Sequence, residues 1–287
     1  MKLPTLSHRL VLLASLSMLP LLNAQNSTSI TLETIRDTTI YSQAENSNGQ
    51  GSYIFVGETQ GEEERRALLA FDLSEIPSDA AILEASLSLY MNKTVVGGVN
   101  IHLHRLIRDW GEGPSDAPGQ EGMGAPAEEG DSTWLQSIYP DTPWEVAGGE
   151  FISQPSATAI VGGTGYDEWS GDGLITDVQG WIDRPNTNYG WILVGETGVT
   201  TTKRFDSRHS SNPDRRPTLT VTYTAGPPLL WAGYQIEPDG RSVNTGDWLG
   251  WIDVGTPPWV YSYTLNKFIY LPEDEITDLG AWSYLPK

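Results

Sequence analysis

The sequence predicts an all-β protein, a jelly-roll-like β-sandwich with a long acidic insertion loop and a small aromatic β-meander at the C-terminus. Thirty Gly, 19 Pro and an aromatic share of 10% are typical of many short strands and turns. About ten segments alternate apolar and polar residues with period two, whereas helical spacing appears in one short segment. The chain contains no Cys, so a hydrophobic core alone must hold the fold together.

The first 24 residues have the layout of a secretory signal peptide. A short basic start at Lys2, His8 and Arg9 precedes the apolar run from Leu10 to Leu22, and Ala24 offers a small residue before a polar stretch. The apolar run is too short to span a membrane, which takes about 20 residues. We expect cleavage after Ala24 and a protein that is secreted or held at the cell surface, with no transmembrane segment in the mature chain.

Residues 25–224 carry the predicted sandwich. Its early strands are expected at residues 30–35, 38–43, 52–58, 67–77, 82–91 and 99–106, because each combines β-branched or aromatic residues with period-two alternation. The residues expected to point inward are Leu69, Phe71, Leu73, Leu83, Ala85, Leu87, Leu89, Val99, Ile101 and Leu103. One helix is expected between Gly173 and Pro185, and the closing strand at residues 217–223 should place Leu219, Val221 and Tyr223 inward.

Between Asp109 and about Ser170 the alternation stops, and Gly, Pro and acidic residues dominate. Loops of this length tend to be functional or mobile. Four tryptophans punctuate this loop: Trp110, Trp134, Trp144 and Trp169. Two interpretations remain open, since exposed rings would suit the apolar faces of sugars and buried rings would anchor the loop to the core.

After a linker at residues 225–228, the last segment, residues 229–287, has a different composition. It holds five of the 11 Trp and five of the 12 Tyr. Four short aromatic strands are expected there, at "WLGWIDV", "PWVYSYT", "KFIYLP" and "AWSYLP".

The charge of the chain excludes one class of partner and suggests a cation. Removing Lys2 and Arg9 with the signal peptide leaves 15 basic against 37 acidic residues, which argues against nucleic acid. Acidic loops can supply the oxygen ligands of a structural Ca²⁺, and the candidates are Asp109, Glu112, Asp131 and Asp172. His102 and His104 have the spacing of a metal pair, but polar residues on the outer face of a strand explain them better.

Five of the 17 basic residues gather between Lys203 and Arg216. Such a cluster could bind an anionic partner or could close the fold through ion pairs. We favour closure by Asp206, Arg208 and Arg216, with Asp206 paired to a nearby Arg, and keep Lys203 and Arg204 as candidate ligand-binding residues.

Two groups of motifs carry a family resemblance. "RRALLAFDLSEIP" is followed by "AAILEASLSLY", and "DVQGWIDRPNTNYGWILVGE" is followed by "KRFDSRHSSNPDRRPTLTVTY". This ordered series, over about residues 29–224, resembles the DNRLRE domain family, which overlaps family 96 of the carbohydrate-binding modules. The resemblance implies a bacterial β-sandwich that binds polysaccharides, in some members acidic ones such as alginate. His209 stands where the family often has Glu.

We therefore expect a secreted, non-catalytic carbohydrate-binding module for an extracellular polysaccharide, acidic ones included, or for another component of the cell envelope. A structural or adhesive surface protein, attached through its C-terminal aromatic unit, is the alternative. A polysaccharide lyase or hydrolase is less favoured, because no nucleophile motif and no identifiable pair of catalytic carboxylates marks an active site.

Overall fold

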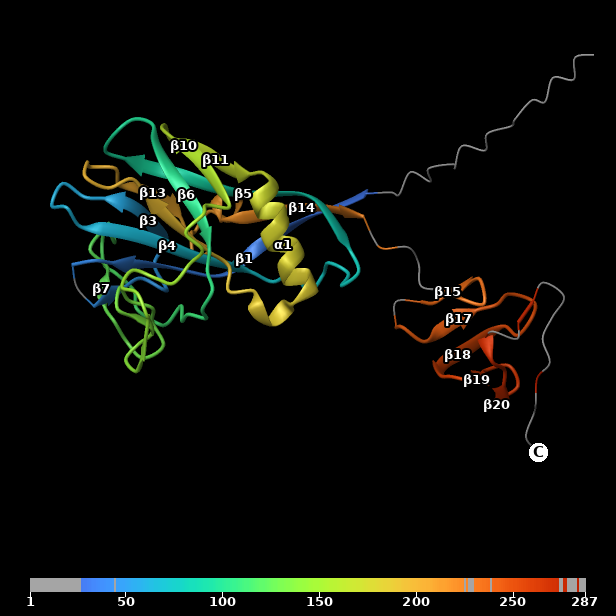
Figure 1. The fold of residues 1–287 in the computed structure, drawn as a ribbon. Coiled ribbons are helices and arrows are strands. Elements are labelled where there is room, and N and C mark those ends of the chain that lie inside the picture. The colour runs from blue at the N-terminus through green and yellow to red at the C-terminus, as the bar shows by residue number, and fades with distance from the viewer. Residues whose placement is uncertain are drawn as a thin grey trace, which may run out of the picture.

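Two antiparallel sheets, here named sheet A and sheet B, form a β-sandwich that accounts for most of the described chain (Figure 1). The computed structural model describes residues 27–43, 45–224, 226, 230–237, 239–273, 276, 277 and 283. The signal peptide expected at residues 1–24 lies outside this range. The all-β sandwich is confirmed, whereas a jelly-roll order of its strands stays a prediction.

Sheet A consists of six strands, and the long strand β5 lies at its centre. They are β1 (Ser27–Tyr41), β14 (Thr218–Thr224), β5 (Ala81–Thr94), β11 (Gly165–Ser170), β13 (Lys203–Asp206) and β3 (Tyr53–Glu58). The first half of β5 pairs with β14 and its second half with β13, while β11 also pairs with β5.

Sheet B contains the second half of β1, the end of β3 and four further strands. These are β4 (Glu64–Phe71), β12 (Trp191–Gly195), β6 (Val99–Arg105) and β10 (Ala157–Val161). Pairing runs in the order β1, β4, β12, β6 and β10.

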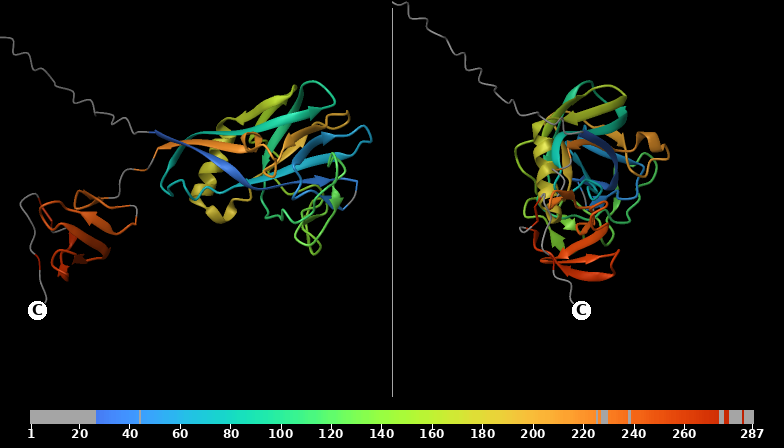
Figure 2. Two further views of the ribbon diagram at one scale, coloured as in Figure 1. Left: turned by 180° about the vertical axis from the view of Figure 1, so that it is seen from behind. Right: turned by 90° about the vertical axis from the view of Figure 1, so that its right-hand side faces the viewer.

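Strands β1 and β3 belong to both sheets and thereby close the sandwich. The first half of β1 pairs with β14 and its second half with β4, with an irregularity between Thr34 and Arg36. Gly57 adopts φ +107° where β3 passes from β13 to β4, and a side chain there would meet the backbone of Thr201. As predicted, the first and last strands of the sandwich are neighbours, and Figure 2 shows β1 and β14 running side by side.

The main core fills the space between the sheets. Leu87, Leu89 and Leu219 are fully buried there, as are most of the other residues expected to point inward. Helix α1 (Asp172–Asp183) adds Val178 and Trp181, and Trp181 meets Trp191 edge to face at 4.5 Å between ring centroids. The predicted helix is therefore confirmed, and Pro185 opens the short 3₁₀ turn η1 (Pro185–Thr187) that follows it.

One residue expected in the core lies outside it. The pairing of β5 with β14 shifts register between Thr222 and Tyr223, so that Ile82 rather than Leu83 opposes Tyr223. Such a bulge reverses which face a side chain occupies. Ile82 is therefore buried and Leu83 is exposed, against the prediction.

A second core lies on the outer face of sheet B, beneath the acidic insertion loop. The side chains of Leu68, Ala70 and Ile192 point outward from sheet B on this side. They pack against Trp110 and Trp144 from the loop. This explains why β4 is apolar on both faces. Within the loop, β8 (Gln136–Ile138) pairs with β9 (Thr142–Pro143). Its strand β7 (Ala125–Pro126) pairs with β2 (Asn46–Ser47), which lies outside the loop, between β1 and β3.

The C-terminal unit has its own sheet and its own core. Its strands are β15 (Leu230–Trp231), β16 (Tyr234–Gln235), β17 (Ser242–Asn244), β18 (Trp251–Thr256), β19 (Trp259–Ser262) and β20 (Lys267–Tyr270). The last four form an antiparallel meander over a core that includes Val243, Ile252, Val260 and Ile269. The strand expected at "AWSYLP" lies outside the described residues, apart from Ser283.

In the sandwich, a second 3₁₀ turn, η2 (Pro213–Arg215), precedes β14.

None of the helices in the described ranges has the length and apolarity needed to cross a membrane.

Candidate functional site

Three neighbouring strands of sheet A bring Phe55, Arg204 and Lys93 into one row on the outer face. Arg204 lies directly opposite Phe55 of β3 and directly opposite Lys93 of β5. A register shift at this point makes Phe205 oppose Met91, so that Asn92 has no partner. The bulge turns Lys93 outward beside Arg204, although regular alternation from Leu89 and Met91 would have pointed it into the core.

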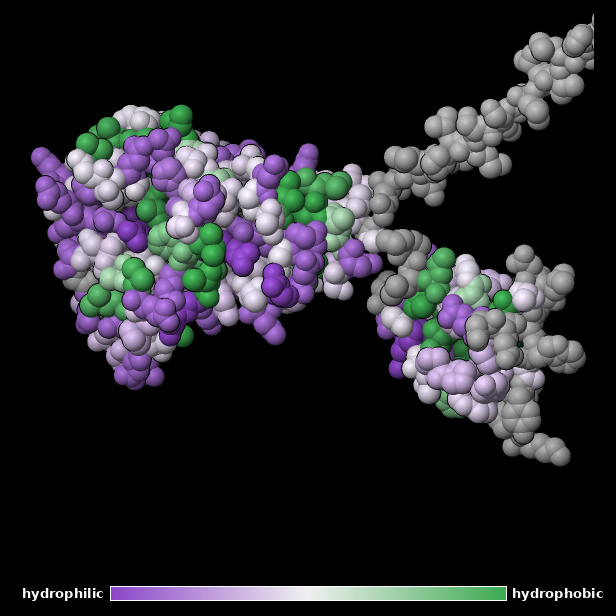
Figure 3. All heavy atoms as spheres, viewed as in Figure 1, coloured by the Kyte–Doolittle hydropathy of each residue, from purple (hydrophilic) through white to green (hydrophobic). Residues whose placement is uncertain are grey.

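The insertion loop forms the other wall of this site. Gln120 and Gly122 face the row, and a Cβ built at Gly122 would touch the ring of Phe55. Between them lies a small open cavity of about 130 Å³. We call this cavity the sheet A groove; it is lined by Phe55, Lys93, Thr94, Val95, Gln120, Gly122, Thr202 and Arg204. No single hydrophobic area dominates the sandwich face in Figure 3, so hydropathy alone does not mark this or another site there.

Both cations of the groove reach the same neutral acceptor. The Oε1 atom of Gln120 accepts hydrogen bonds from Lys93 Nζ at 3.3 Å and from Arg204 Nη1 at 2.9 Å. Arg204 is further oriented by Asn92 Oδ1, which accepts from Nε at 2.7 Å, and by Tyr53, whose ring centroid lies 3.8 Å from the guanidinium carbon. Among the described residues, no carboxylate forms an ion pair with Lys93 or Arg204.

Lys203, the other predicted ligand-binding residue of the cluster, does not reach the groove. Its side chain is fully buried, and its ammonium donates to Thr94 Oγ1, Val96 O and Gly97 O at 2.6–2.8 Å. Burial lowers the pKa of this ammonium, which the charge of Asp167 partly offsets. Lys203 therefore holds the end of β5 in place and is not available to a ligand.

Three of the four tryptophans expected in the loop have no ring face free for a sugar. Trp110 and Trp144 anchor the loop on sheet B, whereas Trp169 lies in β11 of sheet A and packs in the main core, so the loop ends earlier than predicted. Trp110, Trp144 and Trp169 are buried, and each indole N–H donates to a backbone carbonyl, of Tyr189, Thr133 and Ile101 respectively. Trp134 is half-buried and packs under the guanidinium of Arg66. The prediction that these rings bind sugar is thus wrong for the three buried residues.

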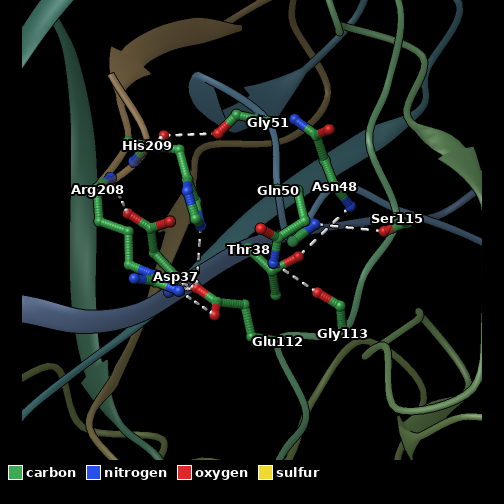
Figure 4. Close-up of polar contacts among 12 residues, drawn as sticks. Asp37, Thr38, Asn48, Gln50, Gly51, Glu112, Gly113, Ser115, Arg208 and His209 are labelled. Carbon is green, nitrogen blue, oxygen red and sulfur yellow. Dashed lines mark hydrogen bonds and ion pairs between the residues drawn. The ribbon is translucent and has the colours of Figure 1, made fainter. Parts of the chain in front are cut away.

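A polar network joins the insertion loop to β1 and to the turn after β13 (Figure 4). The guanidinium of Arg208 binds both carboxylate oxygens of Glu112, at 2.5 and 2.6 Å. Glu112 also accepts from the backbone N–H of Asp37, and Asp37 accepts from the backbone N–H of Arg208 at 2.7 Å. This fork geometry fixes both distance and orientation, and thus holds the start of the loop against the sandwich.

Further contacts extend from this network toward the groove. Asn48 Oδ1 accepts from the backbone N–H of Ala117, and the carboxylate of Glu121 accepts from Asn48 Nδ2 and from the backbone N–H of Tyr53. The loop residues on both sides of Gln120 are therefore fixed to the turn before β3. This chain of contacts decides where the amide of Gln120 lies.

Burial in this network perturbs two titratable groups. Desolvation, reinforced by the nearby carboxylate of Glu112, raises the pKa of Asp37 from 3.8 to about 7, although the Arg208 backbone N–H acts in the opposite direction. Burial and the charge of Arg208 lower the pKa of His209. Its Nε2 atom lies 3.9 Å from Glu112 Oε1.

The residues predicted to close the fold have different partners. Arg208 connects the turn after β13 with the loop and with β1, as described above. Arg216 donates from Nε and Nη2 to the carbonyl of Ser210, which is a local contact. Asp206 accepts from Asn92 Nδ2 across the β13–β5 pairing and forms no ion pair among the described residues, although Arg215 and Arg204 are near enough for their charges to act on its pKa.

The four acids proposed for calcium are not brought together. Asp109 pairs with Arg36 and Glu112 with Arg208, while the buried Asp131 accepts from Ser115 and from the backbone of Glu128. Asp172 lies in the first turn of α1.

The described ranges contain no group of three or more His, Asp or Glu placed to hold a metal ion. His102 and His104 instead bind Thr158 Oγ1 and the carbonyl of Ile152.

Sequence reasoning missed Phe55, Lys93 and Gln120 as site residues. Lys93 carries the one signal that was available, since the whole chain has only five Lys and this one stands next to a predicted strand. In the sequence, the apolar Phe55 within a strand is typical of a core residue. Gln120 lies in a loop whose position depends on contacts with distant segments.

Comparison with known families agrees with the predicted resemblance. Residues 28–113 match the model of carbohydrate-binding module family 96, which confirms the family resemblance inferred from the motifs. The matched range runs from β1 through β6 and includes Phe55 and Lys93, and it ends before Gln120 and Arg204. No curated protein matches the chain.

Proposed function

We propose that this chain, whose sandwich matches a family of carbohydrate-binding modules, is exported and binds an acidic extracellular polysaccharide in the sheet A groove without cleaving it. One observation carries the proposal. Two cations stand side by side at the groove without a carboxylate partner among the described residues, in a chain of net charge -20. Carboxylates are plentiful in such a chain. Two neighbouring cations that form no ion pair with any of them have their charge available for a ligand.

The geometry suits a uronate or a sulfated sugar. Gln120 Oε1 already occupies the point at which hydrogen bonds from Lys93 and Arg204 converge. A carboxylate at that point would accept the same two bonds with charge assistance, and such bonds are about twice as strong as neutral ones. Val95, which is 64% exposed, provides apolar surface beside the cations for the C–H face of a sugar ring.

The lining of the groove supports binding over catalysis. It contains no Asp, Glu or His, which are the side chains that most often act as general acid or base. A glycosidase would need two carboxylates flanking the bound sugar.

Affinity electrophoresis through gels containing alginate tests the proposal. Arg204→Ala and Lys93→Ala should each weaken retardation by about tenfold, because each removes a charge-assisted hydrogen bond contributing about 1.5–3 kcal/mol. Arg215→Ala is the matched control, since Arg215 lies over Tyr90 and does not line the groove, so its loss should leave retardation unchanged.

Pectate and a sulfated galactan should be run in parallel to define the acidic group that is recognised. The proposal fails if none of the three polymers retards the full chain. It also fails if the Arg204 and Lys93 variants are retarded as strongly as the unmodified chain.

A further inference from the structure

The outer face of the C-terminal meander is aromatic where a solvent-exposed sheet face is normally polar. One face of this sheet packs on the unit's own core through Val243, Ile252, Val260 and Ile269. Period-two alternation places six aromatic residues on the opposite face, and these are Trp251, Trp259, Tyr261, Tyr263, Phe268 and Tyr270.

Several of these rings lie open to solvent. Tyr263 is 51% exposed, Phe268 50% and Trp251 46%. The unit has already buried its core on the other side, so folding does not require these rings. An exposed aromatic patch of this kind marks a binding surface.

A pocket opens in this face, with aromatic walls and a charged pair at one side. Its volume is about 390 Å³, the size of a site for a small ligand, and it is lined by Arg241, Asp253, Gly255, Thr256, Tyr261, Tyr263 and Phe268. Asp253, Tyr261 and Phe268 lie directly opposite one another on β18, β19 and β20.

The aromatic side chains of the pocket support one another. The Tyr261 ring meets Tyr263 at 5.3 Å and 84°, and meets Phe268 at 5.1 Å and 64°. Edge-to-face contacts of this kind hold ring orientation. Tyr263 and Phe268 therefore present oriented rings on either side of Tyr261.

The charges of the pocket neutralise each other. Arg241 forms an ion pair with Asp253, and the Asp253 carboxylate, followed by contacts with Tyr263, raises the pKa of Arg241. The Arg241–Asp253 pair has no net charge, and it still presents a hydrogen-bond donor next to an acceptor. The sheet A groove differs in this respect, because its two cations have no anionic partner among the described residues.

We propose that this pocket is a second carbohydrate-binding site, for neutral sugar residues. Aromatic walls accept the C–H face of a sugar ring, and the Arg241–Asp253 pair offers a donor and an acceptor to neighbouring hydroxyl groups. An acidic sugar would have to approach the Asp253 carboxylate, which disfavours it. The site lies outside residues 28–113 and does not depend on the sheet A groove.

Affinity electrophoresis of the full chain tests this site, with gels that contain a soluble β-glucan, a xylan or a galactomannan. We expect at least one of the three polymers to retard the full chain. The double variant Tyr263→Ala and Phe268→Ala should weaken that retardation tenfold or more and leave retardation by alginate unchanged. Leu265→Ala is the matched control, because Leu265 is 49% exposed on the β19–β20 turn and does not line the pocket.

The Arg204→Ala variant should show the reverse pattern, with neutral polymers bound and alginate lost. The charge argument has its own test in that background. Adding Asp253→Asn leaves Arg241 without its partner and should restore part of the alginate retardation.

Three outcomes would overturn the proposal. The first is that no neutral polymer retards the full chain. The second is that the double variant, with an unchanged thermal unfolding profile, keeps full retardation. The third is that sedimentation reveals a concentration-dependent dimer that the double variant abolishes while polymer binding is absent, because the face would then join two copies of the chain.

Discussion

Lys203 and Arg204 are adjacent in the sequence, and the alternation of β13 gives them opposite environments. Lys203 points into the sandwich and is fully satisfied by one hydroxyl and two carbonyl groups. Arg204 points outward into the groove. A cluster that looks uniformly basic in the sequence thus combines a structural cation with one that a ligand can reach.

Replacing Lys203 by Met should destabilise the protein by about 2–3 kcal/mol, because the carbonyls of Val96 and Gly97 lose a charged donor. Urea unfolding followed by Trp fluorescence measures this. Lys93→Met is the control and should change stability by no more than about 0.5 kcal/mol, since Lys93 is exposed. Equal effects of both substitutions would contradict a structural role for Lys203.

The raised pKa of Asp37 predicts a specific pH dependence of stability. Between about pH 4 and pH 7 the unfolded chain ionises this carboxyl whereas the folded protein keeps the proton, so the unfolded state binds fewer protons. The contribution of Asp37 to the free energy of unfolding therefore falls as the pH rises through this window, and is constant above it.

The variant Asp37→Asn should lack this fall. Urea unfolding of both proteins at intervals from pH 4.5 to pH 8 would show the wild-type curve declining relative to the variant. Parallel curves over this range would show that Asp37 titrates normally.

At the scale of elements, the insertion loop covers the outer face of sheet B and also forms one wall of the sheet A groove. Trp110 and Trp144 bury its apolar residues on sheet B, and the Arg208–Glu112 pair fixes its start. Because the loop carries Gln120, the shape of the groove depends on contacts outside it.

Glu112→Gln should loosen the loop without unfolding the sandwich. Removing the charge weakens the paired hydrogen bonds from Arg208, and we expect amide hydrogen exchange at residues 111–124 to accelerate by about tenfold.

Glu129→Gln provides the control, as Glu129 is an exposed acid of the same loop. Exchange that rises equally in both variants would contradict the assignment of Glu112 as the residue that holds the loop. Unchanged exchange in Glu112→Gln would do the same.

For the whole molecule, the sandwich and the C-terminal unit have separate hydrophobic cores, and no strand pairing among the described residues joins them. We therefore expect two transitions in differential scanning calorimetry. Ile252→Ala should lower only one of them, since it removes a fully buried side chain from the smaller core at a cost of about 2–5 kcal/mol. A single transition that shifts as a whole would show that the two units unfold together.

Much of the fold follows from local pattern. The alternation of Leu219, Val221 and Tyr223 predicts a strand with one buried face, and the spacing of Val178, Trp181 and Ile182 predicts the helix that ends before Pro185. These features depend on residues that are close in the chain, so the sequence shows them directly.

The residues of the sheet A groove could not be predicted from local sequence pattern, because their positions depend on strand pairing over long sequence distances. A bulge in β5 turned Lys93 outward and another turned Leu83 out of the core, and each shift arises from pairing with a strand more than 100 residues away. The Trp residues of the loop were ambiguous for the same reason, since burial depends on what packs over them.

By itself, then, the sequence determined the strands, the helix, the closing strand and the class of sandwich, because period-two alternation is a property of neighbouring residues. Only the tertiary structure decided which cations are free, because charge neutralisation is a matter of distance in space. It buried Lys203, paired Arg208 with Glu112, and placed Arg204 beside Lys93 with no ion-pair partner among the described residues.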